Sequence, residues 1–381
     1  MKLAILKERR PGEARVAATP ETVKKLKGLG LDILVESGAG ARARVSDTDF
    51  ETAGAVVTPD VGQMLGEADI VFSVRGPGEA EIAKMKKGAV LACMLAPYTE
   101  KDMIQRLAAQ GVTAFAMEFI PRISRAQAMD VLSSQANLAG YKAVIDAAAQ
   151  FGRAMPMMMT AAGTIAPARV FIMGVGVAGL QAIATARRLG AIVSATDVRP
   201  AAKEEIKSLG ATFVGVEDEE TAKQTGPYAG ELSAAFRQKQ AELMAATVAK
   251  NDIVICTALV MGRRAPVIVT AEMVAAMRPG SVIVDLAADA GGNCAATRPG
   301  ELAVTENGVK VLGWHNWPGR IPVAASALYA RNLLTFLTTF WDREAGAPRL
   351  PAEDDIVKGV LLTRDGAVVH PQFAPQQSAA A

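Results

Sequence analysis

Short apolar runs alternate with amphipathic stretches from the N-terminus to about residue 125. The apolar runs have the length of buried strands, whereas stretches 20–30 and 100–111 have the apolar spacing of helices and end at glycine. Strands that alternate with helices predict a parallel sheet with helices on its faces. The predicted strands of this first sheet are residues 2–6, 32–36, 69–74, 89–95 and 113–117.

A second and stronger α/β pattern begins near residue 168. Its apolar runs predict strands at residues 168–173, 191–197, 212–216, 252–258, 281–287 and 309–314. The segment 217–231 interrupts this pattern with polar residues, glycine and proline. Loops of that length inside a compact domain are usually functional or disordered, so we expect a long mobile loop here.

Two long helical patterns, at residues 131–150 and 324–341, flank the second sheet. We interpret them as crossings between two domains, with the C-terminal segment returning to the first domain. The predicted domains are residues 1–130 together with 325–381, and residues 131–324. The predicted fold class is α/β, with two Rossmann-like, doubly wound parallel-sheet domains joined by long helices. We expect a cleft between the domains, which is a common place for ligands.

Length and charge narrow the class of protein. A chain of 381 residues is too long for one core and suggests two domains. Its 41 basic and 39 acidic residues leave a net charge of +2, which gives no broad electrostatic attraction to nucleic acid or to an anionic membrane. The N-terminus lacks a signal-peptide pattern, and no apolar run approaches the ~20 residues of a membrane helix. We therefore expect a soluble protein with no nucleic-acid partner.

Side chains for metal binding and acid–base chemistry are scarce. The cysteines, Cys93, Cys256 and Cys294, lie far apart and have no CxxC spacing, which favours a reducing compartment and argues against a disulfide scaffold or a zinc site. Metal sites and general acid–base sites often use imidazole, and His315 and His370 are the only histidines. No metal site is predicted.

A glycine-rich stretch marks a dinucleotide-binding loop. Gly174, Gly176 and Gly179 form GxGxxG after a predicted strand, the following helix ends at Gly190, and the next strand ends at Asp197. This context meets the conditions of the fingerprint. Gly174 permits the tight turn, Gly176 lets a diphosphate approach the backbone, and Gly179 permits close packing of helix and strand.

The end of the next strand indicates the cofactor. The Asp197 carboxylate would accept hydrogen bonds from the adenosine ribose hydroxyls and repel a 2′-phosphate, which favours NAD(H) over NADP(H). Arg199 can accommodate a 2′-phosphate, although an arginine there is more often a solvated side chain. The residues predicted to bind NAD(H) here are Gly174, Gly176, Val177, Gly179, Asp197, Val198 and Arg199, with Ala258 and Leu259 on the adenosine side.

Three long motifs and the C-terminal tail resemble one known family. KERRPGEARVAATPETV (7–23) resembles the opening signature of alanine dehydrogenases and of the NAD-binding component of nicotinamide nucleotide transhydrogenases. The glycine-rich segment 174–199, VIVDLAADAGGN (282–293) and the tail RDGAVVHP (364–371) resemble the same joint family. The match spans essentially the whole chain, so the remaining question is which branch it belongs to.

Residues that the alanine dehydrogenase branch needs for proton transfer are replaced. That branch has a lysine in a V-K-E-P segment; here the segment reads VRGP (74–77), with Arg75 in place of the lysine. That branch also has a histidine after the following strand; here the segment reads ACMLAP (92–97), with Met94 or its neighbours in place of the histidine. Arginine does not release a proton usefully, and methionine has none to release. Arg15, which engages a carboxylate in that branch, is retained, and so is Asp289. Hydride transfer between two nicotinamides needs no proton transfer, so the pattern favours the transhydrogenase branch.

PRISRAQAMD (121–130) resembles the transhydrogenase loop that carries an arginine, a glutamine and an aspartate. The resemblance implies that Gln127 binds the nicotinamide carboxamide and that Arg122 pairs with Asp130 and reaches cofactor oxygens, with Ser133 as support. Ile123, Ser124 and Arg125 complete this predicted cofactor-binding loop. The alternative is a plain helix N-cap at Asp130, with Arg122 and Arg125 in solvent.

Two further features concern the surroundings of the site. The loop around Tyr228 is predicted to close over bound NAD and exclude water; the alternative is a disordered surface loop. The segment GWHNWPGR (313–320) keeps the Asn316–Pro318 spacing of the family but has Trp314 where histidine is common. We predict that His315 is a packed or surface residue, because the sequence shows no carboxylate partner for it, and that Trp317 contacts a partner.

Taken together, the resemblance implies the NAD(H)-binding subunit of a proton-translocating transhydrogenase. Hydride would pass from NADH to NADP+ held by a partner beta subunit, and a membrane-spanning subunit would couple this step to proton movement. The resemblance also implies a homodimer, cytoplasmic and peripheral on the cytoplasmic face of the inner membrane. The alternatives are a stand-alone amino-acid dehydrogenase of the alanine type and an NAD-binding sensor without turnover.

Overall fold

The computed structural model describes residues 1–216 and 234–374, which divide into two compact units. Unit 1 comprises Met1–Gln135 and Gly319–Ala381, and unit 2 comprises Ala136–Pro318. The predicted boundaries, 130/131 and 324/325, lie a few residues from these. Helix α6 (Val131–Gln150) begins in unit 1 and ends in unit 2.

Unit 1 is built on an eight-stranded sheet with the order β19-β18-β6-β5-β4-β1-β2-β3. Strands β1 to β6 are parallel, in the order found in dinucleotide-binding folds, and the C-terminal strands β18 and β19 add an antiparallel edge beside β6. The strands are β1 (Lys2–Ile5), β2 (Asp32–Glu36), β3 (Val56–Thr58), β4 (Ile70–Arg75), β5 (Val90–Met94), β6 (Thr113–Ala116), β18 (Leu361–Arg364) and β19 (Ala367–Val368).

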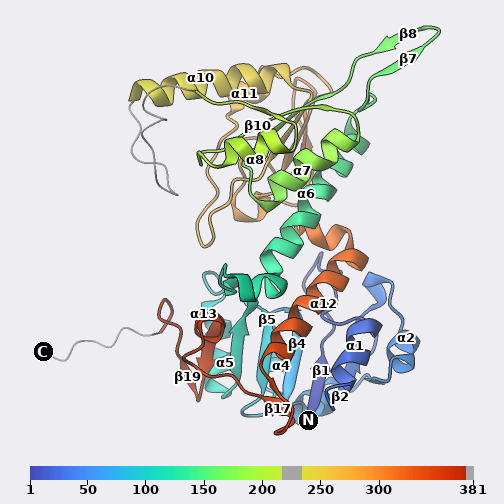
Figure 1. Cartoon of the computed structure of the whole chain (residues 1–381), viewed down its shortest axis with the longest axis vertical. Helices are drawn as coiled ribbons and strands as arrows, with labels where there is room; N and C mark the ends of the chain where they lie inside the picture. The colour runs from blue at the N-terminus through green and yellow to red at the C-terminus, as the bar shows by residue number, and fades with distance from the viewer. Residues whose placement is uncertain (217–233, 375–381) are drawn as a thin grey trace, which may run out of the picture. The chain divides into compact units, whose positions relative to one another are not determined.

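Helices cover both faces of this sheet. Leu3 and Ile5 of β1 belong to one apolar cluster, with α1, α2, α12 and α13, whereas Ala4 belongs to the opposite cluster, with α3, α4 and α5. Figure 1 shows α1 and α12 lying across the strands. The helices are α1 (Pro20–Lys27), α2 (Asp47–Thr52), α3 (Val61–Glu67), α4 (Glu79–Ile82), α5 (Lys101–Ala109), α12 (Pro322–Thr339) and α13 (Asp355–Val360). Short 3-10 helices are η1 (Ala41–Ala43), η2 (Met117–Phe119) and η3 (Ser124–Met129), and β16 (Trp341–Asp342) pairs with β17 (Ala347–Pro348).

Unit 2 is built on a seven-stranded sheet with the order β11-β10-β9-β12-β13-β15-β14, in which only the edge strand β14 runs antiparallel. Its strands are β9 (Arg169–Met173), β10 (Ile192–Thr196), β11 (Thr212–Phe213), β12 (Ile253–Cys256), β13 (Val282–Asp285), β14 (Leu302–Val304) and β15 (Lys310–Leu312). The helices around it are α7 (Val177–Arg188), α8 (Ala202–Ser208), α10 (Ala234–Lys250) and α11 (Ala271–Ala275), with the 3-10 helices η4 (Ala288–Ala290) and η5 (Trp317–Arg320).

The strands of unit 2 are also buried on both faces, since Val170 and Ile172 of β9 pack with α6, α7 and α8, and Phe171 and Met173 pack with α10 and α11. A separate hairpin, β7 (Met158–Thr160) and β8 (Gly163–Ile165), extends away from the rest of unit 2 (Figure 1). Among the residues that the structure describes, no helix has both the length and the apolar character to cross a bilayer.

The predicted fold class is confirmed, and each predicted strand is present. The run 212–216 is shorter than predicted, because only Thr212 and Phe213 pair with β10. The strands that were not predicted are β3, β7, β8, β14, β16, β17, β18 and β19. Most have two or three residues, too few for a long apolar run, whereas β18 has four residues of which three are buried.

Candidate functional site

The glycine-rich loop follows β9 and leads into α7, as the fingerprint predicts. Gly174 has a φ of +98°, and a Cβ there would lie 2.6 Å from Thr257 Oγ1. A Cβ on Gly179 would lie 2.0 Å from the Gly174 carbonyl oxygen, so helix and loop are in contact. A Cβ on Gly176, by contrast, would meet no described atom within 4 Å. Open space therefore lies before the backbone at the N-terminus of a 12-residue helix, which suits the diphosphate of a dinucleotide.

The predicted NAD(H) residues of unit 2 lie at one edge of the sheet. Strands β10, β9 and β12 are parallel neighbours, so their carboxyl ends meet at the same edge. The structure therefore brings together the glycine-rich loop, the segment 197–199 and the segment 258–259. Val198 and Leu259 are 78% and 59% exposed at this edge.

Asp197 is already engaged in this structure. Its carboxylate accepts hydrogen bonds from the backbone N–H of Val175 (2.7 Å), the backbone N–H of Arg199 (2.8 Å) and Arg199 Nε (3.0 Å). Burial alone would raise the pKa of Asp197, but these hydrogen bonds outweigh burial and lower it. Arg199 Nη2 also donates to the Val175 carbonyl (2.8 Å), so Arg199 is hydrogen-bonded although its side chain is 43% exposed. Arg199 Nη2 donates to Asp197 Oδ2 as well (3.2 Å), so four hydrogen bonds occupy the carboxylate. A ribose hydroxyl can reach Asp197 only if Arg199 yields part of this contact.

The predicted loop of unit 1 forms the 3-10 helix η3. Ala126 and Met129 are buried in the core of unit 1, while Arg122 and Gln127 point their side chains to the exposed surface. Among the described residues, the side chains of Arg122 and Gln127 have no hydrogen-bond or ion-pair partner. Both remain available for a ligand, as the loop prediction requires.

Two contacts within this loop differ from prediction. Asp130 caps helix α6, because it accepts the Ser133 N–H (2.8 Å) and the Ser133 hydroxyl (2.6 Å), and the predicted pair between Arg122 and Asp130 is not formed. Arg125 is paired with Asp354 (2.7 Å). The capping interpretation is therefore correct for Asp130, whereas Arg125 does not stand free in solvent. Ile123 and Ser124 are exposed beside these residues.

Asn332 of α12 holds the loop and was not predicted. Its Nδ2 donates to the Ala128 carbonyl (2.8 Å) and its Oδ1 accepts from Ser134 Oγ (2.7 Å). A polar residue inside the apolar helix pattern 324–341 was the signal that could have identified it. Tyr228 and the predicted lid lie outside the described residues.

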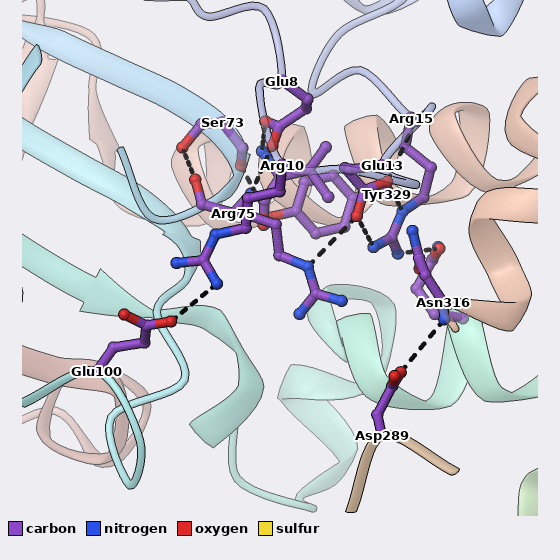
Figure 2. Close-up of polar contacts among 12 residues, drawn as sticks. Glu8, Arg10, Glu13, Arg15, Ser73, Arg75, Glu100, Asp289, Asn316 and Tyr329 are labelled. Atoms are coloured by element: carbon purple, nitrogen blue, oxygen red, sulfur yellow. Dashed lines mark hydrogen bonds and ion pairs between the residues drawn. The ribbon is translucent and has the colours of Figure 1, made fainter. Parts of the chain in front are cut away.

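A buried charged cluster lies near the ends of β1 and β4 in unit 1. Glu13 lies between the guanidinium groups of Arg15 and Arg75, with Arg15 Nη2 at 2.6 Å and Arg75 Nε at 3.3 Å (Figure 2). Arg15 Nη1 also donates to Gln135 Oε1 (2.8 Å). The retained Arg15 is thus fully buried and paired within the protein. Met94 is buried in the core of unit 1.

The pKa values of the two glutamates in this cluster move in opposite directions. Burial raises the pKa of Glu8 to about 7, although its carboxylate accepts the backbone N–H groups of Val74 (2.6 Å) and Arg75 (3.3 Å). Burial alone would also raise the pKa of Glu13, but Arg15 and Arg75 lower it to about 2. Glu13 is therefore a permanent partner for the two arginines.

For the segment 313–320, the predicted surface position of His315 is correct, whereas its lack of a carboxylate partner and the role of Trp317 are not. His315 Nδ1 contacts Asp289 Oδ1, and the Asn316 N–H donates to Asp289 Oδ2 (3.2 Å), so His315 does have a carboxylate partner. His315 is 54% exposed in its side chain, in agreement with a surface residue. Trp317 is 3% exposed and its Nε1–H donates to the Asp285 carbonyl (3.2 Å). The prediction that Trp317 contacts a partner was wrong, because the indole is buried within unit 2.

Both halves of the sequence match models of one family. The N-terminal domain of the alanine dehydrogenase/PNT family matches residues 4–139, and the C-terminal domain of that family matches residues 143–371. The chain belongs to the alanine dehydrogenase/PNT family.

Full-length relatives separate the two branches of this family. The chain is 53% identical to the first portion of NAD(P) transhydrogenase subunit alpha of Rhodospirillum rubrum, over 99% of this chain and 100% of that protein. The crystal structure of transhydrogenase from Sinorhizobium meliloti has a TM-score of 0.89 and 51% identity, over 97% of this chain and 100% of that one. Alanine dehydrogenase of Halomonas elongata is 30% identical, over 97% of this chain and 95% of that protein. The sequence is thus nearer to these transhydrogenases than to this alanine dehydrogenase.

Proposed function

We propose that this chain is the NAD(H)-binding component of a proton-translocating NAD(P) transhydrogenase. Full-length similarity to transhydrogenase alpha subunits supports the enzyme, and the open backbone at Gly176 supports the cofactor. Bound NADH supplies a hydride, which passes to NADP+ held by a partner beta subunit. A membrane-spanning subunit couples that transfer to proton movement.

We assign the residues of the site as follows. The backbone around Gly174, Gly176 and Val177 holds the diphosphate, and Gly179 keeps α7 close to β9. Asp197 accepts the adenosine ribose hydroxyls, with Val198, Arg199, Ala258 and Leu259 beside it. Gln127 orients the nicotinamide carboxamide and Arg122 binds cofactor oxygens, with Ile123, Ser124, Arg125, Asp130 and Ser133 shaping that loop.

The residues around Arg75 support hydride transfer without proton transfer. Arg75 stands where the alanine dehydrogenase branch has lysine, and Met94 or its neighbours stand where that branch has histidine. Arginine and methionine are not useful acids or bases near neutral pH. Arg15 is buried against Glu13, where it has no room for a substrate carboxylate without breaking that pair. The chain therefore aligns rings and excludes solvent instead of moving a proton.

The assembly that we propose is a homodimer, peripheral on the cytoplasmic face of the inner membrane. The β7–β8 hairpin supports the dimer, because Met157, Met158 and Met159 are 58%, 41% and 77% exposed and Ile165 is 39% exposed. Consecutive large apolar side chains on a projecting hairpin favour burial against another protein surface. A second copy of this chain is the partner that we assign to it.

The experiment that tests the function mixes the purified chain with the NADP-binding component of a transhydrogenase. We expect hydride exchange between NADH and a nicotinamide analogue of NADP, and no oxidation of alanine when the chain is given alanine and NAD+ instead. Oxidation of alanine alone would instead establish the dehydrogenase alternative. Binding of NADH with neither activity would establish a sensor.

A further inference from the structure

The segment that follows β13 contains the family motif DLAADAGGN, to which the proposed function assigns no role. The structure builds this segment around Asp285, which is fully buried. Four groups donate hydrogen bonds to its carboxylate: the backbone N–H groups of Ala287 (2.9 Å), Asn293 (2.6 Å) and Cys294 (3.1 Å), and the hydroxyl of Thr297 (2.6 Å). Asp285 thus fixes the position of Asn293.

The side chain of Asn293 in turn holds a different loop. Asn293 is fully buried, and its Nδ2 donates to the carbonyl oxygens of Ala258 and Pro266, both at 2.8 Å. An amide nitrogen has two hydrogens, so both are used. The two carbonyls lie at the two ends of residues 259–265, so one carboxamide joins both ends of this loop. Asn293 Oδ1 is buried without a hydrogen-bond partner among the described residues.

The backbone of the same segment anchors the far end of the loop. The Asn293 carbonyl accepts the N–H groups of Ile268 (2.8 Å) and Val269 (3.0 Å), and the Ala265 N–H donates to the Ala290 carbonyl (2.8 Å). Residues 259–264 between these anchors are exposed. An exposed loop of this kind depends on its two ends for its conformation.

The near end of the loop touches the dinucleotide loop directly. Thr257 Oγ1 donates to the Gly174 carbonyl (2.8 Å), and Gly174 is the residue at which the chain turns into the glycine-rich loop. Residues 258 and 259, which follow Thr257, are those assigned to the adenosine half of the cofactor. The loop held by Asn293 therefore begins beside the proposed NAD(H) site.

We propose that Asn293 is a positioning residue, which holds loop 259–265 in the conformation that binds the adenosine half of NAD(H). The inference rests on the proposed function, since it deepens the assignment of Ala258 and Leu259. Asn293 acts through the loop and touches neither the nicotinamide nor the transferred hydride. Its removal therefore weakens NADH binding and leaves the hydride-transfer step intact.

Asn293→Asp provides the sharpest variant, because the side chain keeps its shape while the donor that faces two carbonyls becomes an acceptor. Loss of two hydrogen bonds of ordinary strength raises the Kd for NADH roughly tenfold or more, with the hydride-exchange rate at saturating NADH within about twofold of wild type.

The matched control is Asn251→Asp. Asn251 is also buried and its Nδ2 donates to the Thr247 carbonyl (2.8 Å), but it precedes β12 at the opposite end of the strand. The Kd of Asn251→Asp for NADH should stay within about twofold of the wild-type value. An unchanged Kd in Asn293→Asp, or an equal loss in both variants, overturns the proposal.

A measurement on the unaltered chain keeps the proposal testable if the Asn293 variant does not fold. Amide hydrogen exchange across residues 257–269 should slow when NADH is added, because the loop borders the cofactor. A chain that binds NADH without slowing exchange there refutes the loop assignment alone. A chain that does not bind NADH refutes the proposed function, so the two failures are distinguishable.

Discussion

Glu8, in the buried charged cluster, makes the stability of unit 1 depend on pH. The pKa of Glu8 is raised by burial from an ordinary value of 4.5 to about 7. The folded chain therefore binds more protons at Glu8 than the unfolded chain between these two pH values. The contribution of Glu8 to stability is complete below pH 4.5 and is lost as the pH rises through 7, by about 3 kcal/mol.

Glu8→Gln should remove this pH dependence, because glutamine is neutral throughout and retains an acceptor for the Val74 N–H. We expect the free energy of unfolding of wild type to fall by about 3 kcal/mol more than that of Glu8→Gln between about pH 5 and about pH 8. Urea unfolding curves at the two pH values measure the difference. Parallel losses in both proteins would mean that Glu8 is already ionised in the fold at the lower pH.

Gln127 provides a test of the proposed ring alignment. Its exposed side chain has no partner in the described residues, so its shortening to asparagine removes no contact of the fold. We expect Gln127→Asn to slow hydride exchange far more than it weakens NADH affinity, since alignment contributes to the rate and many other contacts contribute to binding. Equal losses in rate and in affinity, measured by stopped-flow exchange and by NADH titration, would contradict this role.

The sequence could predict residues whose role is local and could not predict those paired across the chain. Gly174, Gly176 and Gly179 act through the backbone of one turn, so their spacing alone indicates their role. Arg125 and Asp354 are 229 positions apart, and no local pattern joins them. His315 and Asp289 lie in two separate sequence motifs, and only the fold brings their side chains together.

In the turn between strand β9 and helix α7, Gly179 and Gly176 have different functions. A Cβ at Gly179 would press on the Gly174 carbonyl, whereas a Cβ at Gly176 would enter open space. We expect Gly179→Ala to destabilise unit 2 by about 1–3 kcal/mol, because helix and strand must separate. Gly176→Ala should keep the melting temperature of wild type and weaken NADH binding at least about tenfold, because the methyl group occupies the place of the diphosphate.

Thermal unfolding and NADH titration of both variants measure these outcomes. Each variant serves as the control for the other, since both add one methyl group to the same turn. Tight NADH binding by a folded Gly176→Ala chain would show that the diphosphate lies elsewhere.

Strands inside long apolar runs were predictable, and most short strands were not. Strand β4, five of whose six residues are buried, gives an apolar run that cannot be mistaken for a loop. Strand β3 pairs only at the edge of its sheet, and Val56 is 61% exposed, so its pattern resembles a turn. The hairpin β7–β8 is exposed throughout and has no buried face to produce periodicity.

At the scale of the whole molecule, the β7–β8 hairpin tests the proposed homodimer. Met157→Ser combined with Met159→Ser removes apolar surface that we assign to the dimer interface, so the double variant should shift toward monomer. Sedimentation velocity across a range of protein concentrations measures the shift. The control is Val56→Ser, which alters an equally exposed apolar residue of β3 in unit 1 and should leave the assembly unchanged. An unaltered dimer in the double variant would place the interface elsewhere.

The central claim is that this chain presents a hydride donor and handles no proton. The most direct measurement uses NADH that carries deuterium at the transferred position, mixed with this chain, the NADP-binding component and an NADP analogue in ordinary water. We predict that the deuterium appears in the reduced NADP analogue without dilution by solvent hydrogen. Solvent hydrogen at that position would contradict the account. So would deuterium at C2 of alanine when pyruvate and ammonia replace the analogue in the mixture.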